Sequence, residues 1–198
     1  MKLEPFWWDI DQPLAPRLPV GDMPANVDFV IVGGGFTGLS AALTIARQGR
    51  SVVVLDRGQP GFGASTRNGG ICSGNIRPSH SALSNTHGST FADDVYAEGI
   101  TARLDLAKFC AEEKIDCQLQ MTGRFTGAMS QSDYDRQARE VDRLNKINGH
   151  VAYMVPKSEQ ESEITTNLFF GGMLREEIGG FHLGKFLPAF WQKRKPPV

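Results

Sequence analysis

The feature that most constrains the fold is a glycine-rich turn between an apolar segment and an amphipathic one. Residues 33–38 read Gly-Gly-Gly-Phe-Thr-Gly. They follow Val27 to Val32, a β-branched run typical of a strand buried on both faces of a parallel sheet. Thr37 to Gln48 then has helical spacing of its apolar residues, and Gly49 is suited to end that helix. Ser51 to Leu55 predicts a second buried strand, which completes a βαβ unit with a right-handed crossover.

The turn itself has the spacing GxGxxG of a dinucleotide-binding motif. Gly33 would permit the tight turn, Gly35 a close approach of the backbone to a pyrophosphate, and Gly38 close packing of helix and strand. The start of the helix would offer free N–H groups and a positive dipole end to phosphates. A turn that binds nothing is the alternative, and the predicted strand and helix on either side disfavour it.

An acidic residue at the end of the second predicted strand supports this interpretation. Asp56 lies 18 residues beyond Gly38, close to the spacing of roughly 20 residues expected for an acid that binds an adenosine ribose. Arg57 leaves a second possibility open, because a neighbouring arginine can accept the 2′-phosphate of NADP.

The next segment separates the cofactor classes. Gly58 to Gly74 contains six glycines and no helical period, so it predicts a long irregular loop of the functional kind. A nicotinamide-binding domain would continue here into another apolar helix. The small residues of 61–70, with Arg67 and Asn68 among them, instead suit a loop folded against a large planar or phosphorylated ligand. A flexible surface loop is the alternative.

Downstream, helical and strand patterns alternate. The predicted elements are a helix over 92–113 with Gly99 as a point of interruption, two short strands in 115–129 with a turn near Gly123, a helix over 132–148 with Ser132 as its cap, a strand over 151–155, a turn and short helix over 156–163, strand and loop over 168–183, and a helical stretch over 185–193.

The N-terminal residues predict an extended arm. Residues 1–26 contain five prolines and lack the apolar core of a signal peptide. We expect Phe6, Trp7 and Trp8 to pack onto the chain's own domain. The uncharged run from Phe29 to Ala46 is better explained by a strand, a turn and a helix than by a membrane span.

Composition excludes several classes of protein. The 21 basic and 22 acidic side chains leave no basic excess for nucleic acid, and the basic tail at 193–195 is too short to indicate nucleic acid or a membrane. Three cysteines without CxxC spacing predict unpaired buried thiols in a reducing, cytoplasmic compartment. The scattered histidines show no ligand spacing, so no metal site is expected. These are His80, His87, His150 and His182.

The stretch 28–70 resembles the N-terminal flavin-binding segment of the D-amino-acid-oxidase-like FAD-dependent oxidoreductases, and is most similar to their γ-glutamylputrescine oxidase branch. The resemblance is carried by the extended glycine fingerprint and by GFGAS-x-RNGG at 61–70. More weakly, 115–128 resembles the first strands of the family's substrate domain. Residues 179–182 resemble a Gly-Gly-x-His-Pro segment, with Leu183 in place of proline. The fingerprint residues are Gly33, Gly35, Gly38, Ala42, Gly49 and Asp56.

The resemblance implies an α/β fold: a Rossmann-like FAD-binding domain followed by the start of an α+β substrate domain. It implies that FAD is the cofactor and that a small amine or amino acid is oxidised by hydride transfer to the flavin, with hydrolysis of the imine and reoxidation by oxygen. No catalytic residue is identified. The residues implied in cofactor binding are Gly33, Gly35, Phe36, Thr37, Gly38, Asp56, Arg57, Ala64, Ser65, Arg67, Asn68, Gly69 and Gly70.

The expected organisation is an arm at 1–26, the N-terminal part of an FAD-binding domain at 27–114 and the beginning of a substrate domain at 115–198. Family members are longer, so the sequence is interpreted as their N-terminal portion, with an open sheet that could dock with a missing C-terminal half or another chain. The alternatives are a non-catalytic FAD- or nucleotide-binding fragment and, less favoured, an NAD(P)-dependent dehydrogenase. No contact with nucleic acid or membrane is expected.

Overall fold

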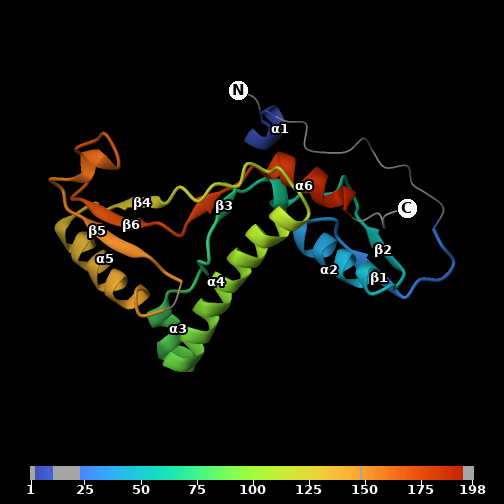
Figure 1. The fold of residues 1–198 in the computed structure, drawn as a ribbon, viewed down its shortest axis with the longest axis horizontal. Coiled ribbons are helices and arrows are strands. Elements are labelled where there is room, and N and C mark those ends of the chain that lie inside the picture. Colours follow the sequence, from blue (N-terminus) through green and yellow to red (C-terminus); the bar gives the residue numbers. More distant parts are fainter. Residues whose placement is uncertain (1–2, 11–22, 148, 194–198) are drawn as a thin grey trace. The chain divides into compact units, whose positions relative to one another are not determined.

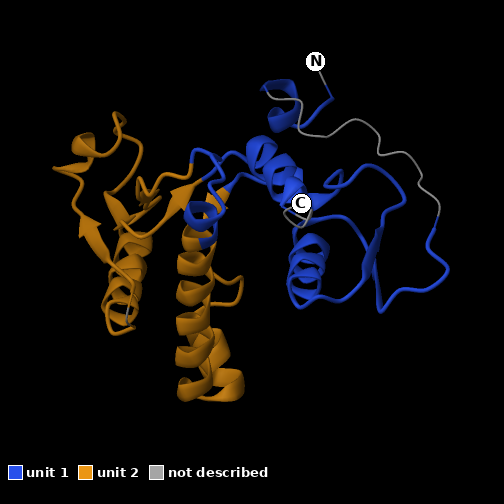
Figure 2. Ribbon diagram, turned by 45° about the vertical axis from the view of Figure 1, so that its right-hand side comes forward, with its two compact units in different colours: residues 1–70, 109–118, 181–198 blue, residues 71–108, 119–180 orange. Residues whose placement is uncertain are grey.

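A computed structural model describes residues 3–10, 23–147 and 149–193 of the chain. Figure 1 labels its helices and strands, and Figure 2 shows the two compact units, which interleave along the sequence. Unit 1 comprises 1–70, 109–118 and 181–198, and unit 2 comprises 71–108 and 119–180. The domains predicted from the sequence follow one another along the chain and do not interleave. Their boundaries remain a prediction. The prolines at 13–19 and the basic tail beyond residue 193 lie outside the described residues.

Unit 1 is built around the predicted βαβ arrangement. Strands β1 and β2 pair in parallel, from Phe29 opposite Val52 to Val32 opposite Leu55, and α2 connects them. The strand, turn and helix predicted for 29–46 are therefore confirmed. The elements of unit 1 are α1 (Phe6–Ile10), β1 (Phe29–Val32), α2 (Phe36–Arg47), β2 (Val52–Leu55), the 3₁₀ helix η1 (Ala64–Thr66) and α6 (Leu183–Gln192).

Two expectations about unit 1 were wrong. The arm is not extended throughout, because Phe6–Ile10 forms the helix α1. The strands are not buried on both faces: Val30 is 54% exposed and Val32 is 85% exposed. The described residues add no third strand to the β1–β2 pair, and α2 packs against it with Leu39, Ala42 and Leu43 buried. A two-stranded sheet therefore leaves apolar strand residues uncovered.

Unit 2 contains a three-stranded antiparallel sheet in the order β4-β6-β5, and β3 pairs antiparallel with β7. The elements of unit 2 are β3 (Ile71–Cys72), α3 (His80–His87), most of α4 (Ser89–Glu112), β4 (Arg124–Gly127), α5 (Gln131–Leu144), β5 (Ala152–Val155), the 3₁₀ helix η2 (Gln160–Ser162), β6 (Gly172–Arg175) and β7 (Gly179–Gly180).

Three details of the downstream prediction require correction. Gly99 does not interrupt α4; a Cβ there would lie 2.2 Å from the carbonyl oxygen of Gly74, so glycine permits a close backbone approach. Segment 115–129 contains one strand, β4, with Gln120 forming only an isolated bridge. Its extended path is broken at Gln118, where φ is 53°. Helix α5 is capped by Ser130, whose Oγ accepts from Asp133 N at 3.2 Å, and not by Ser132.

Each unit has its own buried side chains. The core of unit 2 is formed by α4, α5 and β5, through the residues Tyr96, Val141, Leu144, Ile147 and Ala152. In unit 1, α6 contributes the fully buried Leu183 and Leu187. Cys110 and Cys117 are buried as predicted, with their Sγ atoms 3.7 Å apart, which is longer than a disulfide bond.

Among the described residues, no helix has the length and apolar character needed to cross a bilayer.

Candidate cofactor-binding site

The glycine-rich turn closes tightly between β1 and α2. Gly33 has φ of 108°, a conformation that favours glycine, and its N–H donates to the carbonyl oxygen of Leu55 at 2.7 Å. A Cβ at Gly38 would lie only 1.9 Å from the carbonyl oxygen of Gly33. The absence of a side chain at Gly38 therefore lets the first turn of α2 rest directly on the loop, as the motif predicts.

The first turn of α2 presents backbone amides that no capping side chain of its own satisfies. Gly35 is the N-cap residue and has no side-chain oxygen, but Ser65 reaches in from the following loop. The Oγ of Ser65 accepts from Phe36 N at 3.0 Å, and it would lie 2.8 Å from a Cβ at Gly35. Gly35 thus makes room for Ser65 in the described structure, whereas the sequence predicted room for a pyrophosphate.

Asp56 lies at the carboxyl end of β2 and contacts the turn directly. Its Oδ2 accepts from Gly34 N at 2.7 Å, and its Oδ1 accepts from Gly58 N at 2.9 Å. The side chain remains exposed, so its unused lone pairs can still accept from a sugar hydroxyl. The neighbouring Arg57 is also exposed. The structure therefore brings Asp56 together with the turn and leaves Arg57 at the surface beside it.

The loop 61–70 is held in shape by its own polar groups. Asn68 Nδ2 donates to the carbonyl oxygen of Ala64 at 3.0 Å, and its Oδ1 accepts from Gly70 N at 2.9 Å. Gly70 has φ of 68°, and a Cβ there would lie 2.4 Å from the carbonyl oxygen of Phe181. Thr37 and Gly69 are exposed on the turn and the loop. The loop is thus ordered by defined bonds, which disfavours the flexible alternative.

Arg67 makes contacts that the sequence did not predict. Its guanidinium carbon lies 4.7 Å from the ring centroid of Trp8 and 4.5 Å from that of Phe62. Its Nε donates to the carbonyl oxygen of Phe62 at 2.7 Å. The two rings contact each other, with centroids 4.9 Å apart, and the guanidinium lies against both through cation–π contacts.

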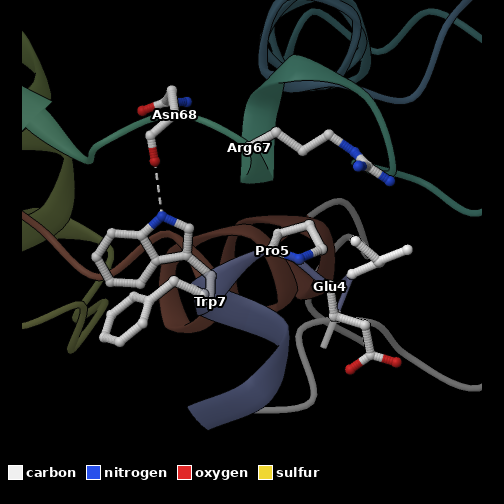
Figure 3. Close-up of a pocket in the computed structure, with 7 residues that line it drawn as sticks. Glu4, Pro5, Trp7, Arg67 and Asn68 are labelled. Carbon is white, nitrogen blue, oxygen red and sulfur yellow. Dashed lines mark hydrogen bonds between the residues drawn. The ribbon is translucent and has the colours of Figure 1, made fainter. Parts of the chain in front are cut away.

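The N-terminal helix packs onto this loop through Trp7 and Trp8, as expected, whereas Phe6 is 66% exposed. Trp7 Nε1 donates to the carbonyl oxygen of Asn68 at 2.7 Å, as Figure 3 shows, and Trp8 Nε1 donates to Oγ1 of Thr66 at 2.9 Å. An open hollow of about 510 Å³ lies beside these contacts, lined by residues 3–7, Arg67 and Asn68. Thr66 was missed by sequence reasoning, and no signal marked it apart from its place inside the GFGAS-x-RNGG stretch.

His182 has a structural position in unit 1. It caps α6, where its Nδ1 accepts from Lys185 N at 3.2 Å, and its ring centroid lies 4.8 Å from that of Trp7. The helix begins directly at Leu183, so the residue that replaces the expected proline is the first of α6. Within the described part of the chain, no group of His, Cys, Asp or Glu could hold a metal ion.

A buried charged cluster lies outside this site, in unit 2, and sequence reasoning missed it. Glu177 Oε1 accepts from Arg175 Nε at 2.8 Å and lies 3.1 Å from His150 Nδ1. Burial opposes the ionisation of Glu177, but the hydrogen bonds of His150 and Arg175 outweigh it and lower its pKa to about 2. Arg175 also contacts Asn75, and Arg103 donates to the backbone carbonyl of Glu177. The cluster thus links four segments of unit 2.

The geometry of unit 1 fits the adenosine-diphosphate half of a dinucleotide. A parallel strand pair, a helix N-terminus on a glycine turn and a carboxylate at the end of the second strand are the elements that bind such a group. The contact of Gly38 with Gly33 is the observation that fits most closely, because any other residue would push the helix off the turn.

Comparison with known proteins gives a consistent result. Residues 28–194 match the family described as DAO, FAD dependent oxidoreductase. The chain is 26% identical to the probable oxidoreductase OrdL of Rhizobium meliloti over 89% of its length and 41% of that protein. It is 26% identical to gamma-glutamylputrescine oxidoreductase of Escherichia coli over 78% of its length and 36% of that protein. It thus spans about two fifths of these relatives.

A solved structure supports the fold. The L-amino acid deaminase of Proteus myxofaciens superposes with a TM-score of 0.70 at 16% identity. The match covers 88% of this chain and 37% of the deaminase.

Proposed function

Because this chain belongs to the DAO family of FAD dependent oxidoreductases, we propose that it forms the FAD-binding part of an enzyme that oxidises an amine or amino acid at a carbon–nitrogen bond. The observation that carries the proposal is the closed glycine turn, in which Gly38 rests on Gly33 and Asp56 contacts Gly34. FAD is the cofactor of this family. When bound, it would accept a hydride from the carbon next to the substrate nitrogen.

The residues of unit 1 would bind the cofactor in distinct ways. The amides at the start of α2 would donate to its phosphates, and Asp56 would accept from a ribose hydroxyl. In the described structure the N–H of Phe36 donates to the hydroxyl of Ser65. When the cofactor binds, this hydroxyl would either donate to the phosphate or move away, so that the N–H of Phe36 can donate to the phosphate. Asn68 and Gly70 would place the loop backbone along the remainder of the cofactor.

The substrate we propose is an amine of the γ-glutamylputrescine type, with oxygen as the electron acceptor. The similarity to the Escherichia coli gamma-glutamylputrescine oxidoreductase supports this choice. The compartment we propose is the cytoplasm, which the buried cysteine thiols support. No residue of the chain is assigned a catalytic role.

A second function is favoured by one specific observation. The strands β1 and β2 expose apolar side chains, and Val32, for example, is 85% exposed. Exposed apolar strand residues are typical of a surface that another chain segment covers. We therefore propose that the remainder of a longer enzyme, or a separate chain, docks on this strand pair. In isolation the chain would then be a cofactor-binding fragment without turnover.

The first experiment is the visible absorption spectrum of the purified 198-residue chain, with and without added FAD. Flavin bands that stay with the protein through gel filtration would support the proposed site, and an amine assay would then separate enzyme from fragment. A folded but colourless protein would contradict FAD binding by this chain alone. Preferential binding of NADPH over FAD would favour the dehydrogenase alternative that Arg57 suggests.

A further inference from the structure

The N-terminal helix makes two directed hydrogen bonds to the predicted cofactor loop. Trp7 and Trp8 are adjacent in α1, and each donates its indole N–H to a residue about 60 positions later in the chain. Both rings are half-buried. An indole has only one hydrogen-bond donor, so its use on a loop residue fixes the orientation of the ring.

The hydrogen bond of Trp8 is the first in a series of hydrogen bonds that ends at the glycine turn. Oγ1 of Thr66 accepts from Trp8 and donates to the carbonyl oxygen of Gly61 at 2.7 Å. The N–H of Gly61 then donates to the carbonyl oxygen of Gly34 at 3.0 Å. Thr66 is fully buried, so breaking its hydroxyl contacts would leave polar groups unsatisfied.

The hydrogen bond of Trp7 is the first in a second series of hydrogen bonds, which ends at α2. Asn68 accepts from Trp7 through its carbonyl oxygen, and its side-chain amide donates to the backbone carbonyl oxygens of Ala64 at 3.0 Å and Ser65 at 3.4 Å. The hydroxyl of Ser65 accepts from Phe36 N, the first amide of α2. The ring of Trp7 also contacts the glycine at the end of the loop, because a Cβ at Gly70 would lie 3.0 Å from Cζ2.

We propose that Trp7 and Trp8 form an N-terminal latch that positions the loop 61–70, and through it the glycine turn and the first amide of α2, for the cofactor. The latch also contacts Arg67, whose guanidinium lies against the rings of Trp8 and Phe62. Trp7 and Trp8 are positioning residues. The effect on cofactor affinity rests on the proposed function, whereas the effect on the loop does not.

The loop can be tested without cofactor, by amide hydrogen exchange of the 198-residue chain. Trp7→Phe and Trp8→Phe keep an aromatic ring and remove one donor each. Because one hydrogen bond contributes a net factor of about threefold to tenfold, we expect exchange at 61–70 and at Phe36 to rise by that factor. Tyr153→Phe is the matched control, since it removes a hydroxyl from a half-exposed ring in unit 2 and should leave this exchange unchanged.

The cofactor is tested by the dissociation constant for FAD, measured from flavin fluorescence. We expect each tryptophan variant to raise it by about threefold to tenfold. A pair of variants at Thr66 adds a rescue test: Thr66→Ser keeps the hydroxyl and should bind as the parent chain does, whereas Thr66→Val removes it and should weaken binding.

The outcomes separate the latch from the proposed function. Unchanged exchange at 61–70 in both tryptophan variants would overturn the latch, whether or not the parent chain binds FAD. Raised exchange with an unchanged FAD dissociation constant would overturn its role toward the cofactor. A parent chain that binds no FAD would contradict the proposed function, while hydrogen exchange would still decide whether the latch orders the loop.

Discussion

The two units use polar groups for different purposes. In unit 2 the side chains of Glu177, Arg175 and His150 are buried and contact one another. In unit 1 the polar groups of the turn and loop are mostly backbone amides and carbonyls near the surface, and Val32 and Val30 are exposed beside them. The polar groups of unit 2 therefore stabilise its interior. Those of unit 1 remain near the surface, where they can bind a ligand.

The largest effect should come from breaking the charged cluster of unit 2. Glu177→Gln would leave the buried guanidinium of Arg175 without its anionic partner, which typically costs about 3–5 kcal/mol. Urea unfolding at pH 7 would measure the loss. Glu176→Gln changes the exposed neighbouring acid and should cost about 0.5 kcal/mol or less. Equal losses in the two variants would contradict a structural role for the cluster.

The same cluster predicts a loss of stability in acid. Since the pKa of Glu177 is lowered from 4.5 to about 2, its ionised form stabilises the fold above pH 4.5, and this contribution disappears as the pH falls toward 2. The contribution amounts to roughly 3 kcal/mol. Unfolding free energies between pH 6 and pH 2 would show this slope, and Glu177→Gln should flatten it. An identical slope in that variant would assign the acid sensitivity to other carboxyl groups.

In unit 1 the most sensitive position should be Gly38. Gly38→Ala places a Cβ against the Gly33 carbonyl, which would force α2 off the turn and cost about 1–3 kcal/mol or more. Thermal unfolding and FAD binding should both be impaired. Gly58→Ala is the matched control, because a Cβ there meets no atom closer than 3.9 Å. Wild-type FAD binding by the Gly38 variant would exclude this turn as the cofactor site.

A smaller and more selective effect is expected at Asp56. Asp56→Asn keeps an oxygen that can accept from Gly34 N but removes the charge, so we expect a modest change in stability and roughly a tenfold higher dissociation constant for FAD. Isothermal titration would measure it. Asp94→Asn, at an exposed helical position of unit 2, should have no effect on affinity. A loss of stability without a loss of affinity would make Asp56 purely structural.

The smallest effect on stability is expected at the exposed strand edge. Val32→Thr changes a side chain that is 85% exposed, so the free energy of unfolding should shift by about 0.5 kcal/mol or less. Solubility should rise, which light scattering would detect, because less apolar strand surface is available for association. A large loss of stability would show that Val32 is covered in solution.

Sequence reasoning predicted local features well and long-range contacts poorly. The turn at 33–38 and the strands around it follow from neighbouring residues, because glycine spacing and β-branched runs act locally. The exposure of Val32 depends on how many strands join the sheet, and no local sequence pattern predicts that number. The pairing of Trp8 with Thr66 joins residues 58 apart, and that of Arg175 with Asn75 joins residues 100 apart. Neither pair carries a periodic signal.

The cap of α2 illustrates a further limit. Ser65 takes the capping role that Gly35 lacks, from a loop 29 residues downstream, so a helix cap need not lie next to its helix in sequence. The same position was assigned to a cofactor by resemblance. A structural partner and a ligand can therefore share one amide, and residue type alone does not tell which of them occupies it.

The pairing of β3 with β7 has a consequence for the order of folding. Ile71 pairs with Gly180, so β3 gains its partner only after more than 100 further residues have left the ribosome. Unit 1 likewise receives α6 from the segment that begins at residue 181. Contacts of such large sequence separation slow folding, because loop closure must precede the stabilising contacts. The glycine turn can therefore form early in synthesis, while the segments that complete both units follow more than 100 residues later.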